Sequence, residues 1–279
     1  MSLFPSIAAF ETALANLPAS DEQARRAAAD RQAQLTKPLG SLGRLEDIAL
    51  FFAGWQGRER PRFDNARMAI FAGNHGIAVH GVSAFPVSVT AAMVQNFEQG
   101  GAAINALCAA AGLDLRVAAL DLDKPTTDFT IAPAMSCTEC LDAINIGAAM
   151  VSDDLDLMAL GEMGIGNSTA GAALAARSFG GTAVDWVGPG TGVDDAGKQR
   201  KIAVINKALA THDYAAKSAF ETLRRVGGRE IAAMAGAILA ARMKSVPVLL
   251  DGFICCSAAA PLVADNPSIT DHCIASHQS

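Results

Sequence analysis

Residues 156–174, DLMALGEMGIGNSTAGAAL, decide the fold of this chain of 279 amino acids. The apolar run at 157–160 is too short for a helix, and a series of glycines follows it. Asn167, Ser168 and Thr169 then precede an alanine-rich segment of helical length. A buried strand, a glycine turn and a helix in this order predict one unit of a parallel α/β sheet.

Four more apolar runs of this kind occur between residues 67 and 253, with helical-length segments between them. They are RMAIFAG at 67–73, LRVAALDLD at 115–123, AVDWVGPG at 183–190 and VPVLLDGF at 246–253. The alternation predicts an α/β fold with a Rossmann-like, doubly wound, mostly parallel sheet flanked by helices. Residues 1–60 have a helical pattern, and we expect this N-terminal segment to pack on the 61–279 core or on a partner subunit.

The composition argues against several classes of protein. Hydrophobic residues make up 51% of the chain, and the net charge is −6 without a long block of Lys and Arg. We therefore expect no nucleic-acid partner and no membrane partner. No uncharged apolar stretch reaches the roughly 18 residues of a membrane span, and the N-terminus is amphipathic, so a cytoplasmic protein is expected. Cys137 and Cys140 have metal-like spacing but lack further ligands, so we expect reduced thiols and no metal.

Four of the five runs end in glycine turns, at 73–76, 161–166, 188–192 and 251–252. Ligands of open parallel sheets bind beyond the carboxyl ends of the strands, so the turns predict one shared site. Gly164 and Gly166 let a ligand approach the backbone, while Asn167 and Ser168 can turn free N–H groups toward an anion. A tight strand-to-helix turn without a ligand explains the same residues.

A second glycine loop, Gly190-Thr191-Gly192, precedes a helical segment with three cations at 198–201. A lysine about one helix length from a glycine loop can supply the counter-charge of a phosphate. The two loops together therefore predict a phosphate site, although a solvated helix face explains the cations equally well. Neither loop has the G-x-x-x-x-G-K-[ST] pattern, which argues against a nucleoside-triphosphatase.

The segment at 73–86 adds candidate side chains near the same edge of the sheet. His75 lies in the first glycine loop, where a single histidine is more often structural than catalytic. Ser83 and Phe85 follow it, and Phe85 either lines a pocket for an aromatic ligand or contributes ordinary packing.

Together these segments resemble the nicotinate-nucleotide:dimethylbenzimidazole phosphoribosyltransferases, a family that makes the α-ribazole phosphate of the cobalamin lower ligand. The resemblance runs from residue 37 to the end of the chain. Its matching segments are KPLGSLG at 37–43, the frame GVSAFP…VT…MVQNF…GGAAIN within 76–105, APAMS at 132–136, GEMGIGNST at 161–169, VGPGTGVDDAG at 187–197 and LLDGFICCSAAAPL at 249–262.

The resemblance implies a homodimer that needs no metal or other cofactor. It implies transfer of phosphoribose from nicotinate mononucleotide to 5,6-dimethylbenzimidazole, giving nicotinate and α-ribazole 5′-phosphate. By the same resemblance, the phosphate-binding residues are Gly164, Gly166, Asn167, Ser168, Gly190, Thr191, Gly192 and Lys201. The benzimidazole is expected near Ser83, Phe85 and Met163.

Glu162 is the strongest catalytic candidate within these 279 residues. Attack by neutral benzimidazole produces a cation unless a base removes its N–H proton. A carboxylate beside the anomeric carbon can accept that proton or stabilise a ribosyl cation. The family's main base is a glutamate in a C-terminal Arg-Leu-Gly-Glu-Gly segment, which these residues lack. Glu162 is therefore expected in a supporting role.

Two further positions depart from the family pattern. Ala91 stands where members often have glutamine, and Asn74 stands where many have aspartate. With the core C-terminally incomplete, we expect the 279-residue form to be weakly active or inactive. A non-catalytic relative that binds the nucleotide or the benzimidazole is the alternative, and a nicotinate mononucleotide hydrolase is a weaker one.

Overall fold

The computed structural model describes residues 2–278 and contains a five-stranded sheet with the strand order β2-β1-β3-β4-β5. Its strands are β1 Ala66–Ala72, β2 Asp114–Ala119, β3 Leu157–Met163, β4 Val248–Leu250 and β5 Cys273–Ala275. All four neighbouring pairs are parallel, so the carboxyl ends of the strands meet at one edge. The predicted doubly wound α/β fold is confirmed.

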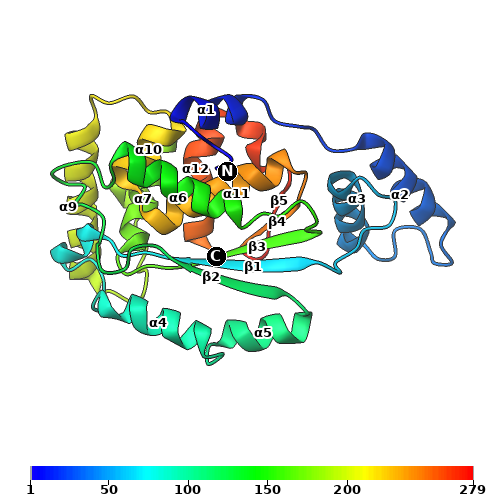
Figure 1. The fold of residues 1–279 in the computed structure, drawn as a ribbon, viewed down its shortest axis with the longest axis horizontal. Helices are drawn as coiled ribbons and strands as arrows, with labels where there is room; N and C mark the ends of the chain where they lie inside the picture. Colours follow the sequence, from blue (N-terminus) through cyan, green and yellow to red (C-terminus); the bar gives the residue numbers. More distant parts are fainter. Residues whose placement is uncertain (1, 279) are drawn as a thin grey trace.

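Helices cover both faces of this sheet (Figure 1). They are α1 Ile7–Ala15, α2 Glu22–Gln34, α3 Arg44–Gln56, α4 Ser88–Glu98, α5 Ala103–Ala111, α6 Cys137–Ala149, α7 Asn167–Phe179, α8 Ala183–Trp186, α9 Asp195–His212, α10 Ala219–Val226, α11 Arg229–Met243 and α12 Phe253–Asp265, with the 3₁₀ helices η1 Gly76–His80 and η2 Pro267–Thr270. On one face lie α6, α7, α10, α11 and α12, whereas α4 and α5 cover the other (Figure 1). Within residues 2–278, no helix is long and apolar enough to cross a bilayer.

The centre of the molecule is α11, in which every residue from 229 to 242 is buried. It packs against α6 on one side and α12 on the other. A helix that is apolar nearly all round is stable only when other elements enclose it. The glutamate and arginines at its ends are therefore exceptions that need a local explanation.

The N-terminal segment packs in two separate places (Figure 1). Helix α1 contacts α10, α11 and α12, with the ring of Phe10 6.3 Å from that of Phe220. Helices α2 and α3 pair with each other at the end of the sheet opposite α9, and Phe52 of α3 packs near Leu157.

One of the five predicted strands is wrong, since residues 183–190 form the short helix α8 and a loop. Thr182 caps this helix, because its backbone N–H and its hydroxyl both donate to the Asp185 carboxylate, at 2.7 and 2.8 Å. This local capping outweighs the apolar character of the run. The loop at 188–192 therefore follows a helix, and its place beside the site depends on α9.

Candidate functional site

The site lies where the direction of strand addition reverses. From β1 the chain adds β2 on one side and β3 on the other, so the loops that leave β1 and β3 diverge at the carboxyl edge. Gly73, the first residue after β1, lies against the end of β3, because its N–H donates to the Met163 carbonyl oxygen at 3.0 Å. Open α/β sheets bind ligands at this kind of switch point.

Glu162 occupies the penultimate position of β3, next to Met163. The side-chain amide of Asn167, the first residue of α7, donates a short hydrogen bond to its carboxylate. Burial of the carboxyl group and, secondly, repulsion by Glu230 raise its pKa to about 7. A group with this pKa can accept or release a proton at neutral pH, as acid–base catalysis requires.

Lys201 of α9 is 1% exposed and connects the two glycine loops. Its ammonium group donates to the Ser168 hydroxyl at 3.0 Å and to the Gly188 carbonyl oxygen at 3.4 Å. A Cβ atom at Gly190 would lie 2.7 Å from Lys201 Nζ and 2.8 Å from Ser168 Oγ and would displace these groups, and the φ of +55° favours glycine. Burial lowers the pKa of Lys201. The structure thus brings together loops that are about 25 residues apart in sequence.

The N-terminus of α7 faces the same place. Gly166 precedes the helix with a left-handed φ of +97°, and no side chain caps the helix there. The first N–H groups of a helix lack intrahelical acceptors and carry partial positive charge. With Ser168 in the first turn and Lys201 beside it, this corner concentrates anion-binding groups.

The remaining predicted site residues lie around this corner. Gly192 and Thr191 are exposed in the second loop, in which Gly190 and Gly192 have φ values of +55° and +100°. Phe85 is half-exposed, and its N–H donates to the Ser83 hydroxyl at 3.3 Å. Arg200 Nε donates to the Gly81 carbonyl oxygen at 3.1 Å, which joins that segment to α9.

Glu230 is not among the site residues predicted from the sequence, and for His75 the sequence favours a structural over a catalytic role. His75 Nε2 lies 2.5 Å from Glu230 Oε1, and both side chains are completely buried at the carboxyl edge. The sequence marks Glu230 only as an acidic residue near the start of a largely apolar segment. An ordinary glutamate in the first turn of a helix gives the same pattern.

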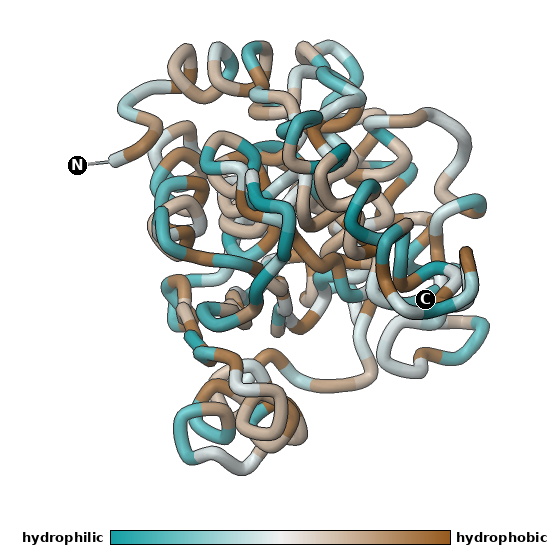
Figure 2. Tube along the Cα trace, turned by 90° about the vertical axis from the view of Figure 1, so that its right-hand side faces the viewer, coloured by the Kyte–Doolittle hydropathy of each residue, from teal (hydrophilic) through white to brown (hydrophobic). Residues whose placement is uncertain are grey.

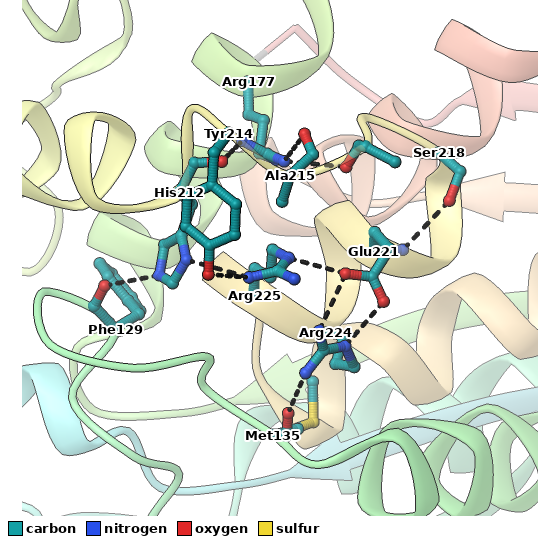
Figure 3. Close-up of polar contacts among 11 residues, drawn as sticks. Phe129, Met135, Arg177, His212, Tyr214, Ala215, Ser218, Glu221, Arg224 and Arg225 are labelled. Carbon is teal, nitrogen blue, oxygen red and sulfur yellow. Dashed lines mark hydrogen bonds and ion pairs between the residues drawn. The ribbon is translucent and has the colours of Figure 1, made fainter.

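The far end of α9 is anchored by a cluster of polar side chains (Figure 3). Arg177 of α7 donates to the carbonyl oxygens of His212, Ala215 and Ala216 at 2.9 to 3.1 Å. The Glu221 carboxylate accepts from Arg225 at 2.7 Å, and from Arg224. The cluster joins α7, α9 and α10, and thereby fixes the helix that presents Lys201 (Figure 3).

The described part of the chain holds no group of three or more His, Cys, Asp or Glu residues arranged for a metal ion. Asp194 instead caps α9 by accepting from the Gly197 N–H at 2.7 Å. On α6, Cys140 is buried and Cys137 is exposed.

Comparison with known proteins identifies the family. A family model described as phosphoribosyltransferase matches residues 17–279. The nicotinate-nucleotide–dimethylbenzimidazole phosphoribosyltransferase of Novosphingobium aromaticivorans is 65% identical over 279 residues, which are 100% of this chain and 82% of that protein. The enzyme of the same name from Rhodobacter capsulatus is 55% identical over 98% of this chain and 81% of its own.

A solved structure agrees with this result. The crystal structure of the nicotinate-nucleotide–dimethylbenzimidazole phosphoribosyltransferase from Thermus thermophilus superimposes with a TM-score of 0.84 at 33% identity. The superposition covers 92% of this chain and 82% of that one. The chain is therefore a phosphoribosyltransferase and belongs to the nicotinate-nucleotide–dimethylbenzimidazole phosphoribosyltransferase family, as its motifs indicate.

Proposed function

We propose that this enzyme transfers phosphoribose from nicotinate mononucleotide to 5,6-dimethylbenzimidazole, forming α-ribazole 5′-phosphate and nicotinate for the lower ligand of cobalamin. The substrates follow from the names of its relatives. The observation that carries the proposal is the buried Lys201, which joins the second glycine loop to Ser168, the residue after the Asn167 that binds Glu162. A buried cation among N–H donors suits a phosphate monoester, and a neighbouring carboxylate suits the sugar carbon that reacts.

The phosphate group is assigned to the corner formed by α7 and the second glycine loop. Its proposed ligands are Gly164, Gly166, Ser168, Gly190, Thr191, Gly192 and Lys201. Asn167 is proposed to support the phosphate site indirectly, because its side-chain amide donates to the Glu162 carboxylate. The benzimidazole is assigned to the neighbourhood of Ser83, Phe85 and Met163.

The proposed chemistry requires one proton acceptor and no acid. Nicotinate bonded through its ring nitrogen is a pyridinium, so it takes the electron pair of the breaking C–N bond and leaves as a neutral ring. One benzimidazole nitrogen forms the new bond to the anomeric carbon with inversion, and the other loses its N–H proton. Glu162, with its pKa near 7, accepts that proton or stabilises the developing cation.

Glu162 is proposed to support a stronger base, the glutamate that the family resemblance places in a C-terminal segment absent from these 279 residues. We accordingly propose that a polypeptide of these residues alone turns over slowly. We also propose a homodimer and a cytoplasmic location, where the six free cysteines stay reduced.

Calorimetric titration with nicotinate mononucleotide tests the phosphate site without requiring turnover. Lys201→Met should weaken binding about 10- to 100-fold, because hydrogen bonds to charged groups are worth about 1.5–3 kcal/mol. Lys198→Met is the matched control, since Lys198 lies on the same helix and pairs with the exposed Asp195. Unchanged affinity in Lys201→Met would contradict the assignment.

A product assay on the same samples separates the possible activities. Formation of α-ribazole 5′-phosphate, which should accelerate when the family's C-terminal segment is attached, supports the transferase. Binding without product even in the extended chain would identify a non-catalytic relative. Release of nicotinate in the absence of any benzimidazole would identify a hydrolase.

A further inference from the structure

The proposed chemistry makes no use of the His75–Glu230 pair. Glu230 is the second residue of α11, and His75 lies in the loop after β1, 155 positions away in sequence. Both side chains are fully buried, with Nε2 of His75 2.5 Å from Oε1 of Glu230. A buried acidic side chain is costly unless it is paired, and such groups persist most often where a site requires them.

The backbone is shaped to hold the Glu230 carboxyl group against the strand-end loops. A Cβ atom at Gly73, after β1, would lie 2.6 Å from Glu230 Oε2, and one at Gly228 would lie 2.8 Å from the same oxygen. A Cβ atom at Gly164, after β3, would lie 2.8 Å from Glu230 Oε1. Three glycines from three segments therefore lie against this carboxyl group, beside the His75 ring.

Gly164 also connects this carboxyl group to Glu162. A Cβ atom at Gly164 would lie 3.1 Å from the Asn167 side-chain nitrogen, the atom that donates to the Glu162 carboxylate. The space where that Cβ atom would lie is thus bordered both by Glu230 and by the Asn167 amide of the Glu162–Asn167 pair. Glu230 Oε2 and His75 Nδ1 have no hydrogen-bond partner among residues 2–278. A carboxyl oxygen without a donor, in a region of low dielectric, acts strongly on its neighbours.

Several groups face Glu162, and Glu230 has the largest effect among the charged ones. Burial raises the pKa of Glu162 most, Glu230 raises it next, and Asp251 at the end of β4 raises it least. Asn167 of α7 and His75 lower it. From α12, the Cys255 thiol lies close enough for Glu162 to raise its pKa, and it donates to the Leu160 carbonyl oxygen.

We propose that Glu230, held in place by His75, is a positioning residue for the transfer reaction: across Gly164 it sets the pH range in which Glu162 takes up a proton. The proposal rests on the role proposed for Glu162 above. In the step concerned, the proton leaves the benzimidazole N–H and binds a Glu162 oxygen while the C–N bond forms. Without Glu230, Glu162 would be a weaker base that stays ionised and hydrogen-bonded to Asn167.

Carboxyl ¹³C NMR on protein labelled at the glutamate side chains tests this proposal without substrate. The Glu162 resonance is assigned by its loss in Glu162→Gln. In the wild type its midpoint should lie near pH 7, and Glu230→Gln should lower the midpoint by about 1 pH unit or more, because a like charge is removed while burial remains. Gln still fills the space of Glu230 and can donate to His75.

The matched control is Glu221→Gln, which removes a carboxylate paired with Arg224 and Arg225 on α10. It should leave the Glu162 midpoint unchanged. An equal shift in both variants, or no shift in Glu230→Gln, would overturn the proposal. If Glu230→Gln does not fold, the wild type and Glu230→Ala provide the test. A wild-type Glu162 midpoint near pH 4.5 would overturn the proposal. A wild-type midpoint near pH 7 that is lower in Glu230→Ala would support it.

Activity distinguishes this proposal from the proposed function. If transfer is measurable, the acid limb of kcat in Glu230→Gln should move to lower pH with little change in KM. Normal transfer with an unmoved Glu162 titration overturns only the coupling. A moved titration in a chain that forms no product, even when extended by the family's C-terminal segment, leaves the coupling standing and contradicts the transferase.

Discussion

Two carboxyl groups, Glu162 and Glu230, lie close together at a poorly solvated edge of the sheet. This arrangement opposes folding, because each group loses water and repels the other when both are ionised. A protein that retains it at a site has given up stability for chemistry. The cost is measurable as a pH-dependent difference in stability.

Replacing Glu162 by Gln should therefore stabilise the protein at alkaline pH. The folded-state pKa is about 7 and the ordinary value is 4.5, so the folded state binds the proton more tightly. Wild-type stability then falls as pH rises from 4.5 through 7, by up to about 3 kcal/mol. Gln has no such loss. Thermal melts should show a higher Tm for Glu162→Gln at pH 8 and no gain at pH 4.5; equal differences at both pH values would contradict the assignment.

The sequence predicted some of these residues and missed others for a physical reason. Gly166, Ser168 and Gly190 obey local rules for turns and helix starts, so their surroundings follow from nearby sequence. Glu230 and His75 meet only through the tertiary fold, and neither has a local pattern that marks it. The order of the strands in the sheet decides which residues far apart in the sequence come into contact. The sequence predicted the fold class but not that order.

At the scale of elements, the central contact is between α6 and α11, whose backbones touch. A Cβ atom at Gly236 of α11 would overlap the Ile144 carbonyl group, and one at Gly147 of α6 would overlap that of Ala233. Backbone has less freedom to move aside than a flexible side chain. Small residues at these two positions are what allow α11 to lie within the core.

We expect Gly236→Ala to destabilise the protein by about 1–3 kcal/mol, or more if the helices cannot separate. Gly54→Ala is the matched control, because Gly54 lies inside α3 and a Cβ atom there would have only ordinary contacts, the nearest at 3.5 Å. That change should be neutral or stabilise by up to about 1 kcal/mol, since alanine favours helix. Urea unfolding of both variants measures these changes in the free energy of unfolding. Similar effects of the two substitutions would contradict the packing explanation.

Four of the five predicted strand segments are confirmed, and the two failures have different causes. Apolar runs followed by glycine predict β1 and β3 well, because buried parallel strands are continuously apolar. Residues 183–190 are also an apolar run that ends in glycine, but the capping box of Thr182 and Asp185 starts the short helix α8 there. Strand β5 has only three residues, too few for any periodicity, and forms because β4 offers a free edge.

For the whole molecule, the two faces of the sheet are covered unequally. One face carries the large helical layer around α11, whereas the other carries only α4 and α5, which form the separate coil at the bottom of Figure 2. A hollow of about 650 Å³ opens beneath β4 and β5, lined by side chains such as Phe63, Leu157 and Leu249. A second, almost wholly apolar hollow lies between α5 and the strands and includes Leu107. Uncovered apolar surface of this kind is typical of an interface.

In the homodimer proposed above, we expect the second subunit to cover this apolar surface. Loss of the dimer can be measured. Leu107 is 64% exposed on α5, so Leu107→Glu should leave the subunit folded while placing a charge in the proposed interface. Val184→Glu on α8 is the matched control, because Val184 is 65% exposed and α8 packs on α7 and α9. Light scattering after gel filtration should give twice the 28.7 kDa chain mass for the wild type and the control, and a monomer for Leu107→Glu. A wild-type monomer would contradict the dimer, and a Leu107→Glu dimer would place the interface elsewhere on the surface.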